Sequence, residues 1–227
     1  MRILVTGTDR GVGLALVRVF VEQGFEVFGG VLDGDDWPTG IRARAIGLDV
    51  SDDASVRAAA AAIEGPLDLV VNNVGILGDI ETAALGELDF DDMARVYNVN
   101  ALGSLRVTRA FLPHLLSGPT RLVVNISSEA GSIGLCTRGS WYAYAMAKAA
   151  LNMQSALIHN LLKPLGGRVL VLHPGHVRSF MRGSEDTSGR LTPDEAARRV
   201  AANIERFGFT MGERPEFRGP DGELLPW

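Results

Sequence analysis

The sequence predicts an α/β fold in which helices cover both faces of a doubly wound parallel sheet. Strand-like apolar segments alternate with helix-like segments along the 227 residues, an order typical of right-handed crossovers between parallel strands. Glycine and polar residues follow the ends of these apolar segments, where such sheets bind their ligands. No linker or break in composition divides the chain. We therefore expect one three-layer α/β/α domain over residues 1–227.

The first element is a short apolar run, residues 1–5, which fits a buried strand. A turn with the spacing Gly7-x-x-x-Gly11-x-Gly13 follows, and residues 14–23 continue as a helix-like stretch. Glycines let a backbone turn tightly and approach a pyrophosphate, while a helix start offers unpaired amides and the positive end of its dipole. This turn predicts a dinucleotide site.

The later elements continue the alternation. Apolar runs predict strands at residues 26–32, 42–48, 67–71, 121–126 and 168–172, and longer stretches predict helices at residues 53–63, 90–115 and 142–162. Thr192 followed by Pro193 predicts a further helix, with threonine at the cap and proline at the first position. Residues 178–192 carry little apolar surface, so we expect a weakly packed substrate loop there, able to act as a lid.

Tyr144 and Lys148 stand four residues apart in the helix expected at residues 142–162. One helical turn separates them, so the phenol and the ammonium project from the same face. A nearby ammonium favours the phenolate, and we expect Lys148 to lower the pKa of Tyr144 from its usual value of about 10. Such a tyrosine could donate and accept protons near neutral pH. The same spacing occurs on many surface helices, and the glycine turn upstream is what favours a functional interpretation.

Composition excludes several classes of protein. The net charge is −5 with scattered positive residues, which argues against a nucleic-acid surface. No apolar run is long enough to span a bilayer. A single cysteine, Cys136, permits no disulfide framework, so we expect a cytoplasmic protein. The four histidines show no metal-ligand spacing, so no metal is expected.

Taken together, the motifs resemble the short-chain dehydrogenase/reductase superfamily in its single-domain, Rossmann-fold form, over essentially the whole chain. Four segments carry the resemblance: the glycine turn from Thr6 to Gly13, Asn72-Asn73-Val74-Gly75, the segment around Asn100, and Tyr144-x-x-x-Lys148. The loop that precedes Tyr144 and the ending at residues 217–227 are most similar to the C-factor and Sniffer-type carbonyl reductases.

The resemblance implies an NAD(P)(H)-dependent oxidoreductase that transfers hydride between nicotinamide and a carbonyl or alcohol substrate. Tyr144 would be the general acid/base and Ser128 would hydrogen-bond the substrate oxygen. Lys148 would hold the nicotinamide ribose, and Asn100 would position a water. The family's serine is usually the second of the Ser-Ser pair, so the resemblance implies Ser128 rather than Ser127. Ser127 would point to the opposite side of an extended segment.

A competing tyrosine, Tyr142, lies two residues before Tyr144. Its position four residues on is Met146 rather than a lysine. We therefore expect Tyr142 and Trp141 to line the substrate pocket or to pack.

Cofactor contacts are implied for residues that lie mostly at the ends of strands. NAD-dependent relatives usually carry an acid at the end of the second strand, but Val31 and Leu32 stand there, with Asp33 one residue further. Arg10 could instead meet a ribose 2′-phosphate, so NADP(H) is favoured over NAD(H). The implied contact residues are Gly7, Thr8, Arg10, Gly11, Val12, Gly13, Asp49, Val50, Asn73, Val74, Gly75, Tyr144, Lys148, Pro174, Gly175, Val177 and Ser179.

One alternative function and one assembly state remain expectations. A cofactor-binding regulatory or signalling protein of the same fold is the alternative, and loss of a catalytic residue would have favoured it. None of the four is lost. The resemblance also implies a homodimer or homotetramer. Substrate determinants are expected in residues 77–81, 135–142 and 178–190.

Overall fold

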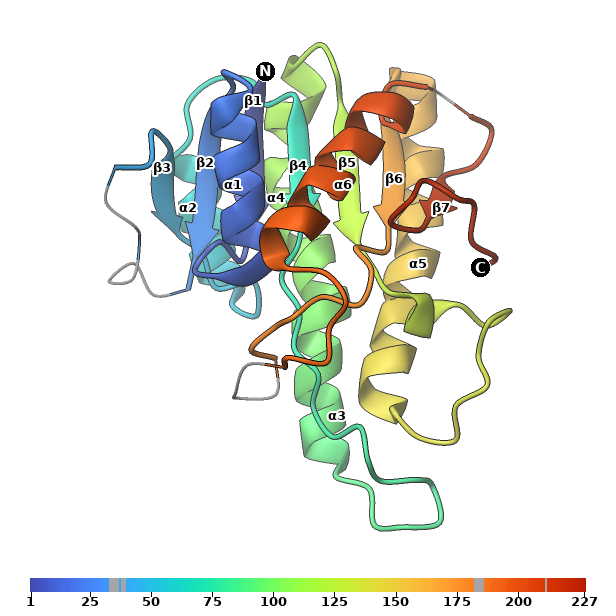
Figure 1. The fold of residues 1–227 in the computed structure, drawn as a ribbon. Helices are drawn as coiled ribbons and strands as arrows, with labels where there is room; N and C mark the ends of the chain where they lie inside the picture. The colour runs from blue at the N-terminus through green and yellow to red at the C-terminus, as the bar shows by residue number, and fades with distance from the viewer. Residues whose placement is uncertain (33–36, 38–39, 182–185, 211) are drawn as a thin grey trace.

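A parallel sheet forms the middle layer of the fold. The computed structural model describes residues 1–32, 37, 40–181, 186–210 and 212–227. Within these residues, seven strands form one sheet of order β3-β2-β1-β4-β5-β6-β7 with every pairing parallel (Figure 1). The strands are β1 Arg2–Thr6, β2 Glu26–Val31, β3 Arg44–Gly47, β4 Leu69–Asn72, β5 Leu122–Ile126, β6 Arg168–Leu172 and β7 Glu216–Arg218.

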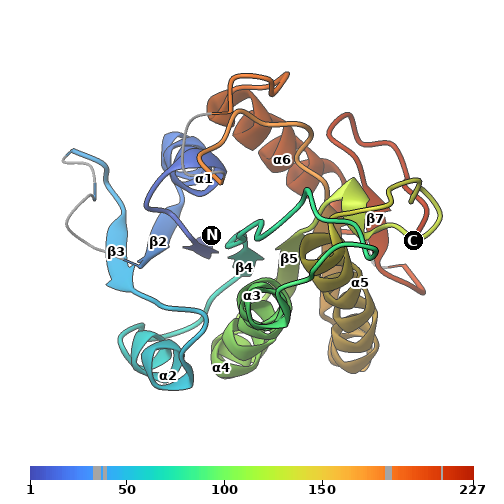
Figure 2. The ribbon, with the colours of Figure 1, turned by 90° about the horizontal axis from the view of Figure 1, so that it is seen from below.

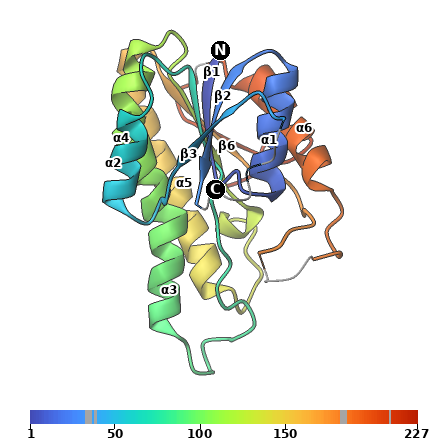
Figure 3. The same cartoon turned by 90° about the vertical axis from the view of Figure 1, so that its left-hand side faces the viewer.

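Helices cover both faces of this sheet. Figure 3 shows α1 and α6 on one face and α2, α4 and α5 on the other. The helices are α1 Gly11–Glu22, α2 Asp53–Ala61, α3 Phe90–Tyr97, α4 Ser104–Ser117, α5 Tyr142–Leu162 and α6 Pro193–Phe207. A π-helical segment, Asn98–Gly103, joins α3 to α4. Among the described residues, no helix is both long and apolar enough to cross a membrane.

The five inner strands contribute to two cores because both of their faces are covered. In β1, Leu4 packs in the cluster that contains Phe28 and Phe111. Its neighbours Ile3 and Val5 point to the opposite face and pack among residues of α1 and α6. Successive strand residues alternate between faces, so one apolar run serves both layers.

The predicted fold class is confirmed, and the differences are local. The third strand is shorter than expected, at Arg44–Gly47, and β7 was not predicted. The helix predicted at residues 90–115 is interrupted by the π-helical segment Asn98–Gly103. The predicted cap at Thr192 is present as a capping box, in which Thr192 and Glu195 each bond the other's backbone amide.

The predicted site residues gather at one end of the molecule. Figure 2 looks toward the carboxyl ends of the strands, where the loops after β1, β4 and β5 come together. In Figure 1, α3 and the first turns of α5 extend beyond the sheet on this side. Helix α5 therefore presents its amino-terminal half to those loops.

Candidate active site

The turn between β1 and α1 is built around close backbone approaches. Gly7 and Gly11 have φ of 68° and 61°, values at which glycine is favoured. A Cβ on Gly13 would lie 2.0 Å from the carbonyl oxygen of Gly7, so this helix residue must also be glycine. Thr8 is buried, and its hydroxyl donates to Gly30 O at the end of β2.

Asn73 fixes the same turn from the neighbouring strand. Its Nδ2 donates to the carbonyl oxygens of Thr6 at 3.0 Å and Gly7 at 3.2 Å. Its backbone amide donates to Thr6 Oγ1 at 3.0 Å. A Cβ on Gly7 would meet Val74 Cγ2 at 2.8 Å. The loops after β1 and β4 are thus locked together at their closest point.

This turn fits the pyrophosphate of a dinucleotide. No side chain caps the start of α1, and its first turn carries no acidic residue. An uncapped helix start after a glycine turn offers amide donors and a positive dipole end to an anion. Arg10 is the N-cap residue, is exposed, and lies with its guanidinium carbon 5.9 Å from the ring centroid of Phe180.

The predicted catalytic side chains come from the loop after β5, from α5 and from the π-helical segment. Tyr144 and Lys148 are buried on one face of α5, and Lys148 Nζ donates to Ile126 O at 2.8 Å. A side-chain hydrogen bond links Tyr144 with Ser128. Ser127 points elsewhere, since its hydroxyl donates to Asn152 Oδ1 at 2.7 Å.

The pKa expectation for the tyrosine is corrected by the structure. Burial raises the pKa of Tyr144 to about 12, and the Ser128 hydrogen bond opposes this only in part. Burial also lowers the pKa of Lys148 to about 8. The ammonium lies 5.7 Å from the Tyr144 ring centroid and is engaged by the Ile126 carbonyl. Loss of solvent therefore dominates the pKa of Tyr144, and the prediction that Lys148 lowers this pKa was wrong.

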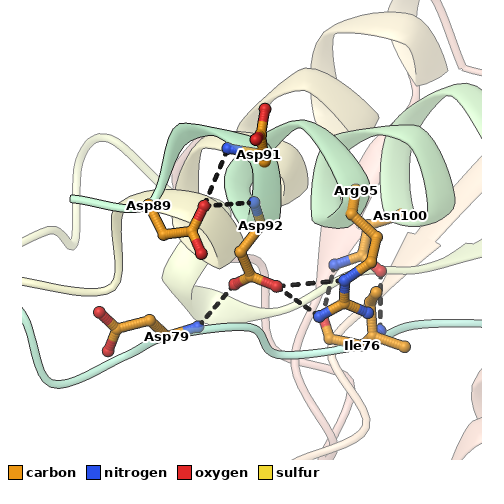
Figure 4. Close-up of polar contacts among 7 residues, drawn as sticks. All are labelled: Ile76, Asp79, Asp89, Asp91, Asp92, Arg95 and Asn100. Carbon is orange, nitrogen blue, oxygen red and sulfur yellow. Dashed lines mark hydrogen bonds and ion pairs between the residues drawn. The ribbon is translucent and has the colours of Figure 1, made fainter.

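Asn100 brings the loop after β4 to the same place. Its Oδ1 accepts from Ile76 N and its Nδ2 donates to Ile76 O, both at 2.8 Å (Figure 4). A Cβ on Gly75 would lie 3.5 Å from Lys148 Nζ and 3.6 Å from Asn100 Oδ1. Gly75 thus leaves space where the ammonium and the amide converge, and π-helical turns occur often at such functional sites.

Comparison with known proteins identifies the family. A sequence model described as short chain dehydrogenase matches residues 1–189. The chain belongs to the short-chain dehydrogenases. It is an NAD(P)-dependent oxidoreductase of the C-factor and carbonyl reductase-like type, which confirms the resemblance drawn from the motifs.

Two relatives and two solved structures show the range of this dehydrogenase's similarity. The C-signal protein of Myxococcus xanthus is 40% identical over 163 residues, which cover 72% of this chain and 94% of that protein. A 1-hydroxy-2-glutathionyl-2-methyl-3-butene dehydrogenase of a Rhodococcus species is 33% identical over 99% of each chain. An NADPH-bound carbonyl reductase from chicken fatty liver superposes with a TM-score of 0.84 at 29% identity, covering 100% of this chain and 98% of that one. The carbonyl reductase Sniffer of D. melanogaster, at 23% identity, superposes with a TM-score of 0.86 over 100% and 99% of the two chains and shows the same fold.

Other predicted contact residues of this dehydrogenase lie at the same edge in different settings. Asp49 Oδ1 accepts from the amide and hydroxyl of Ser51, and Val50 is buried against Gly103. Gly175, with φ of 92°, packs against Leu191 and Pro220. The structure therefore brings together the turn, the loop after β4 and the predicted catalytic residues, while Asp49 and Val50 follow the end of β3.

The expected substrate loop has a fixed stem. Arg178 N donates to Leu191 O, and Leu191 N donates to His176 O, so Val177 and Leu191 form a parallel bridge. Gly189 packs directly on the backbone of Arg178. The prediction of weak packing is wrong for this stem. Residues 182–185 of the loop, like Asp33 near the cofactor turn, lie outside the described residues.

Asn152 is a residue of the site that the sequence analysis did not identify. Trp141 was expected either to line the substrate pocket or to pack. Asn152 Nδ2 donates to Gly131 O while its Oδ1 accepts from Ser127. Its spacing of four from Lys148 and eight from Tyr144 places it on the same helix face, a signal readable in the sequence. Trp141 has a φ of 69° and lies edge-on to Tyr144 with ring centroids 6.0 Å apart. A left-handed tryptophan is strained, and no sequence pattern predicts it.

Proposed function

We propose that this dehydrogenase is an NADP(H)-dependent carbonyl reductase in which Tyr144 is the general acid/base. Two observations carry the proposal: the hydrogen bond between Tyr144 and Ser128, and the approach of Lys148 and Asn100 to Gly75. The nicotinamide cofactor, when bound, supplies or accepts the hydride. Every other step falls to side chains of this chain.

Tyr144 and Ser128 act on the substrate oxygen. A pKa near 12 keeps Tyr144 protonated at neutral pH, so its hydroxyl is ready to donate a proton as negative charge develops on a carbonyl oxygen. Ser128 donates a second hydrogen bond to the same oxygen and stabilises that charge. In the reverse direction Tyr144 takes the proton of the alcohol. Lys148 holds the ribose hydroxyls, and Asn100, through the loop it fixes at Ile76, positions a water that relays protons from Lys148.

Arg10 supports NADP(H) over NAD(H). The guanidinium stands exposed at the start of α1, and Val31, the last residue of β2, carries no charge. The next residue, Leu32, is 70% exposed and also uncharged. Guanidinium groups bind phosphate through charge-assisted hydrogen bonds. The NADPH bound in the chicken carbonyl reductase supports the same choice.

Assembly and location form part of the proposal. Helix α5 leaves four apolar side chains exposed, and their helical spacing places them on one face. They are Met146, Met153, Leu157 and Leu161. Such a stripe supports a homodimer or homotetramer, in which a second copy covers it. The one cysteine of the chain, Cys136, is exposed, which supports a cytoplasmic location.

The substrate side is formed by apolar and aromatic groups. Leu77 and Ile80 cluster with Tyr144, and Trp141 packs against that cluster. These walls support an apolar carbonyl or alcohol substrate, with residues 178–192 as the substrate loop. The regulatory alternative is not favoured, although one relative is named a C-signal, because the reactive set is complete.

A substrate screen tests this function. NADPH oxidation is followed with a panel of aldehydes, ketones and quinones, and the same panel is repeated with NADH and with the Tyr144→Phe variant. Turnover of at least one carbonyl that needs Tyr144 supports the proposal. NADPH binding without turnover of any carbonyl or alcohol, in either direction, would contradict the proposal and favour a regulatory or signalling role.

A further inference from the structure

The loop that follows β4 faces the substrate site and is tied to a helix at two points. Leu77 and Ile80, in this loop, pack against Tyr144. Asn100 holds the loop at Ile76 through two hydrogen bonds. Three residues further on, the backbone amide of Asp79 donates to Asp92 Oδ2 at 3.1 Å. Figure 4 shows both attachments side by side.

Asp92 is itself held in place by its own helix. Arg95 Nε donates to Asp92 Oδ1 at 3.1 Å, and the backbone amide of Asp92 donates to Asp89 Oδ1 at 2.9 Å. Asp89 is the N-cap of α3. The side chain of Asp92 is 20% exposed, so it is partly shielded from solvent. Its carboxylate can therefore act as a fixed acceptor.

Gly78 shows how closely the loop is drawn against α3. Its φ is 66°, and a Cβ there would lie 2.5 Å from Val96 Cγ2 and 2.6 Å from Asp92 Oδ2. Val96 is fully buried. Only glycine combines this backbone conformation with this approach. The loop is thus fitted to the helix at Gly78, between its two attachment points.

The spacing of the attachments matches the two segments. Ile76 and Asp79 are three residues apart, which spans about 10 Å when extended. Asn100 and Asp92 are eight residues apart, about 12 Å along a helix. The loop therefore runs alongside α3 and the π-helical segment in the opposite direction. Leu77 lies between the two anchors, and Ile80 directly follows the second.

We propose that Asp92 is a positioning residue that, through the amide of Asp79, sets the substrate wall formed by Leu77 and Ile80. Asn100 fixes the cofactor-side end of the loop, and Asp92 fixes its substrate-side end. Loss of Asp92 changes substrate affinity rather than cofactor affinity or the proton-transfer step. This assignment rests on the proposed carbonyl reductase function only where it concerns the substrate.

Amide hydrogen exchange tests the attachment without any substrate. In Asp92→Ala, exchange across residues 77–82 should rise about tenfold, because a hydrogen bond to a charged acceptor is lost. Asp91→Ala removes the neighbouring carboxylate, which contributes no side-chain bond to the loop, and should leave this exchange unchanged. Asp92→Asn keeps a carbonyl acceptor and should restore most of the protection. Equal exchange in Asp92→Ala and the unmodified protein would overturn the proposal.

Steady-state kinetics test the substrate wall. With a carbonyl that the unmodified protein reduces, Asp92→Ala should raise KM roughly five- to tenfold, while kcat and the Kd for NADPH change less than about twofold. An unchanged KM in a variant whose loop exchanges faster would overturn the role in substrate binding, as would an equal KM change in Asp91→Ala. If the unmodified protein reduces no carbonyl, the proposed function fails, and the exchange experiment still decides the attachment.

Discussion

The ammonium of Lys148 and the phenol ring of Tyr144 lie within 5.7 Å of each other in a buried part of α5. Burial moves their pKa values in opposite directions, to about 8 for the lysine and about 12 for the tyrosine. Both shifts favour the neutral form of each group. The pair therefore makes the stability of the protein depend on pH in a way that can be measured.

Lys148→Met isolates the lysine contribution to stability. The folded pKa of Lys148 is lowered from 10.5 to about 8, so between pH 8 and 10.5 the unfolded chain binds the proton more tightly than the folded chain. Stability of the unmodified protein should rise with pH across this window relative to Lys148→Met, by about 3 kcal/mol. Urea unfolding at pH 7, 9 and 10 measures the difference. A difference that stays constant with pH would contradict the burial of the charge.

Gly75→Ala tests the space in front of the ammonium. The new methyl would lie 3.5 Å from Lys148 Nζ and 3.6 Å from Asn100 Oδ1, which is ordinary contact, so the fold should lose less than about 1 kcal/mol. The methyl would still occupy the place where the ribose is proposed to bind, and kcat/KM should fall by a factor on the order of 10². Thermal unfolding and kinetics together measure both effects. Unchanged kinetics would argue against a ligand at this place.

Gly13→Ala provides a contrast. Its Cβ would lie 2.0 Å from the Gly7 carbonyl oxygen, so the turn itself must open. This variant should lose about 1–3 kcal/mol of stability along with cofactor affinity. Similar stability in the two alanine variants would show that the glycine turn is less tightly packed than its geometry indicates.

Arg10→Ala tests cofactor choice. If the guanidinium binds the 2′-phosphate, NADPH affinity should fall by roughly 1–3 kcal/mol while NADH affinity hardly changes. Arg18→Ala removes another exposed positive charge from α1 and should affect neither. Fluorescence titration of the unmodified protein and the two variants with each cofactor gives the six dissociation constants. Tighter binding of NADH than NADPH by the unmodified protein would reverse the preference.

The fold could be predicted from the sequence because hydrophobic pattern and glycine spacing are local. The first strand, the turn to Gly13 and the start of α6 at Thr192 each carry their own signal. The π-helical interruption could not be predicted, because it depends on tertiary contacts such as Arg106 with the carbonyl of Val50 and the side chain of Asn98. β7 is three residues long and is defined by its pairing with β6.

The candidate site, like the fold, has some features with a local sequence signal and others that depend on tertiary structure. The four side chains proposed to react could be named from motifs, and the choice of Ser128 rested on its place as the second residue of the Ser-Ser pair. The pKa values of these side chains could not be predicted from the sequence. The pKa of Tyr144 depends on its burial, which residue spacing does not reveal. The attachment of Asp92 to Asp79 is likewise invisible in the sequence, because it joins a loop to a helix 13 residues away.

The turnover of Tyr144→Phe tests the central claim most directly. Tyr142→Phe, two residues earlier on α5, is the matched control. For a carbonyl that the unmodified protein reduces with NADPH, kcat in Tyr144→Phe should fall by a factor of about 10² or more, with the Kd for NADPH nearly unchanged. Tyr142→Phe should retain most of the activity. Equal losses in the two variants, or full activity in Tyr144→Phe, would contradict the assignment of Tyr144 as the proton donor.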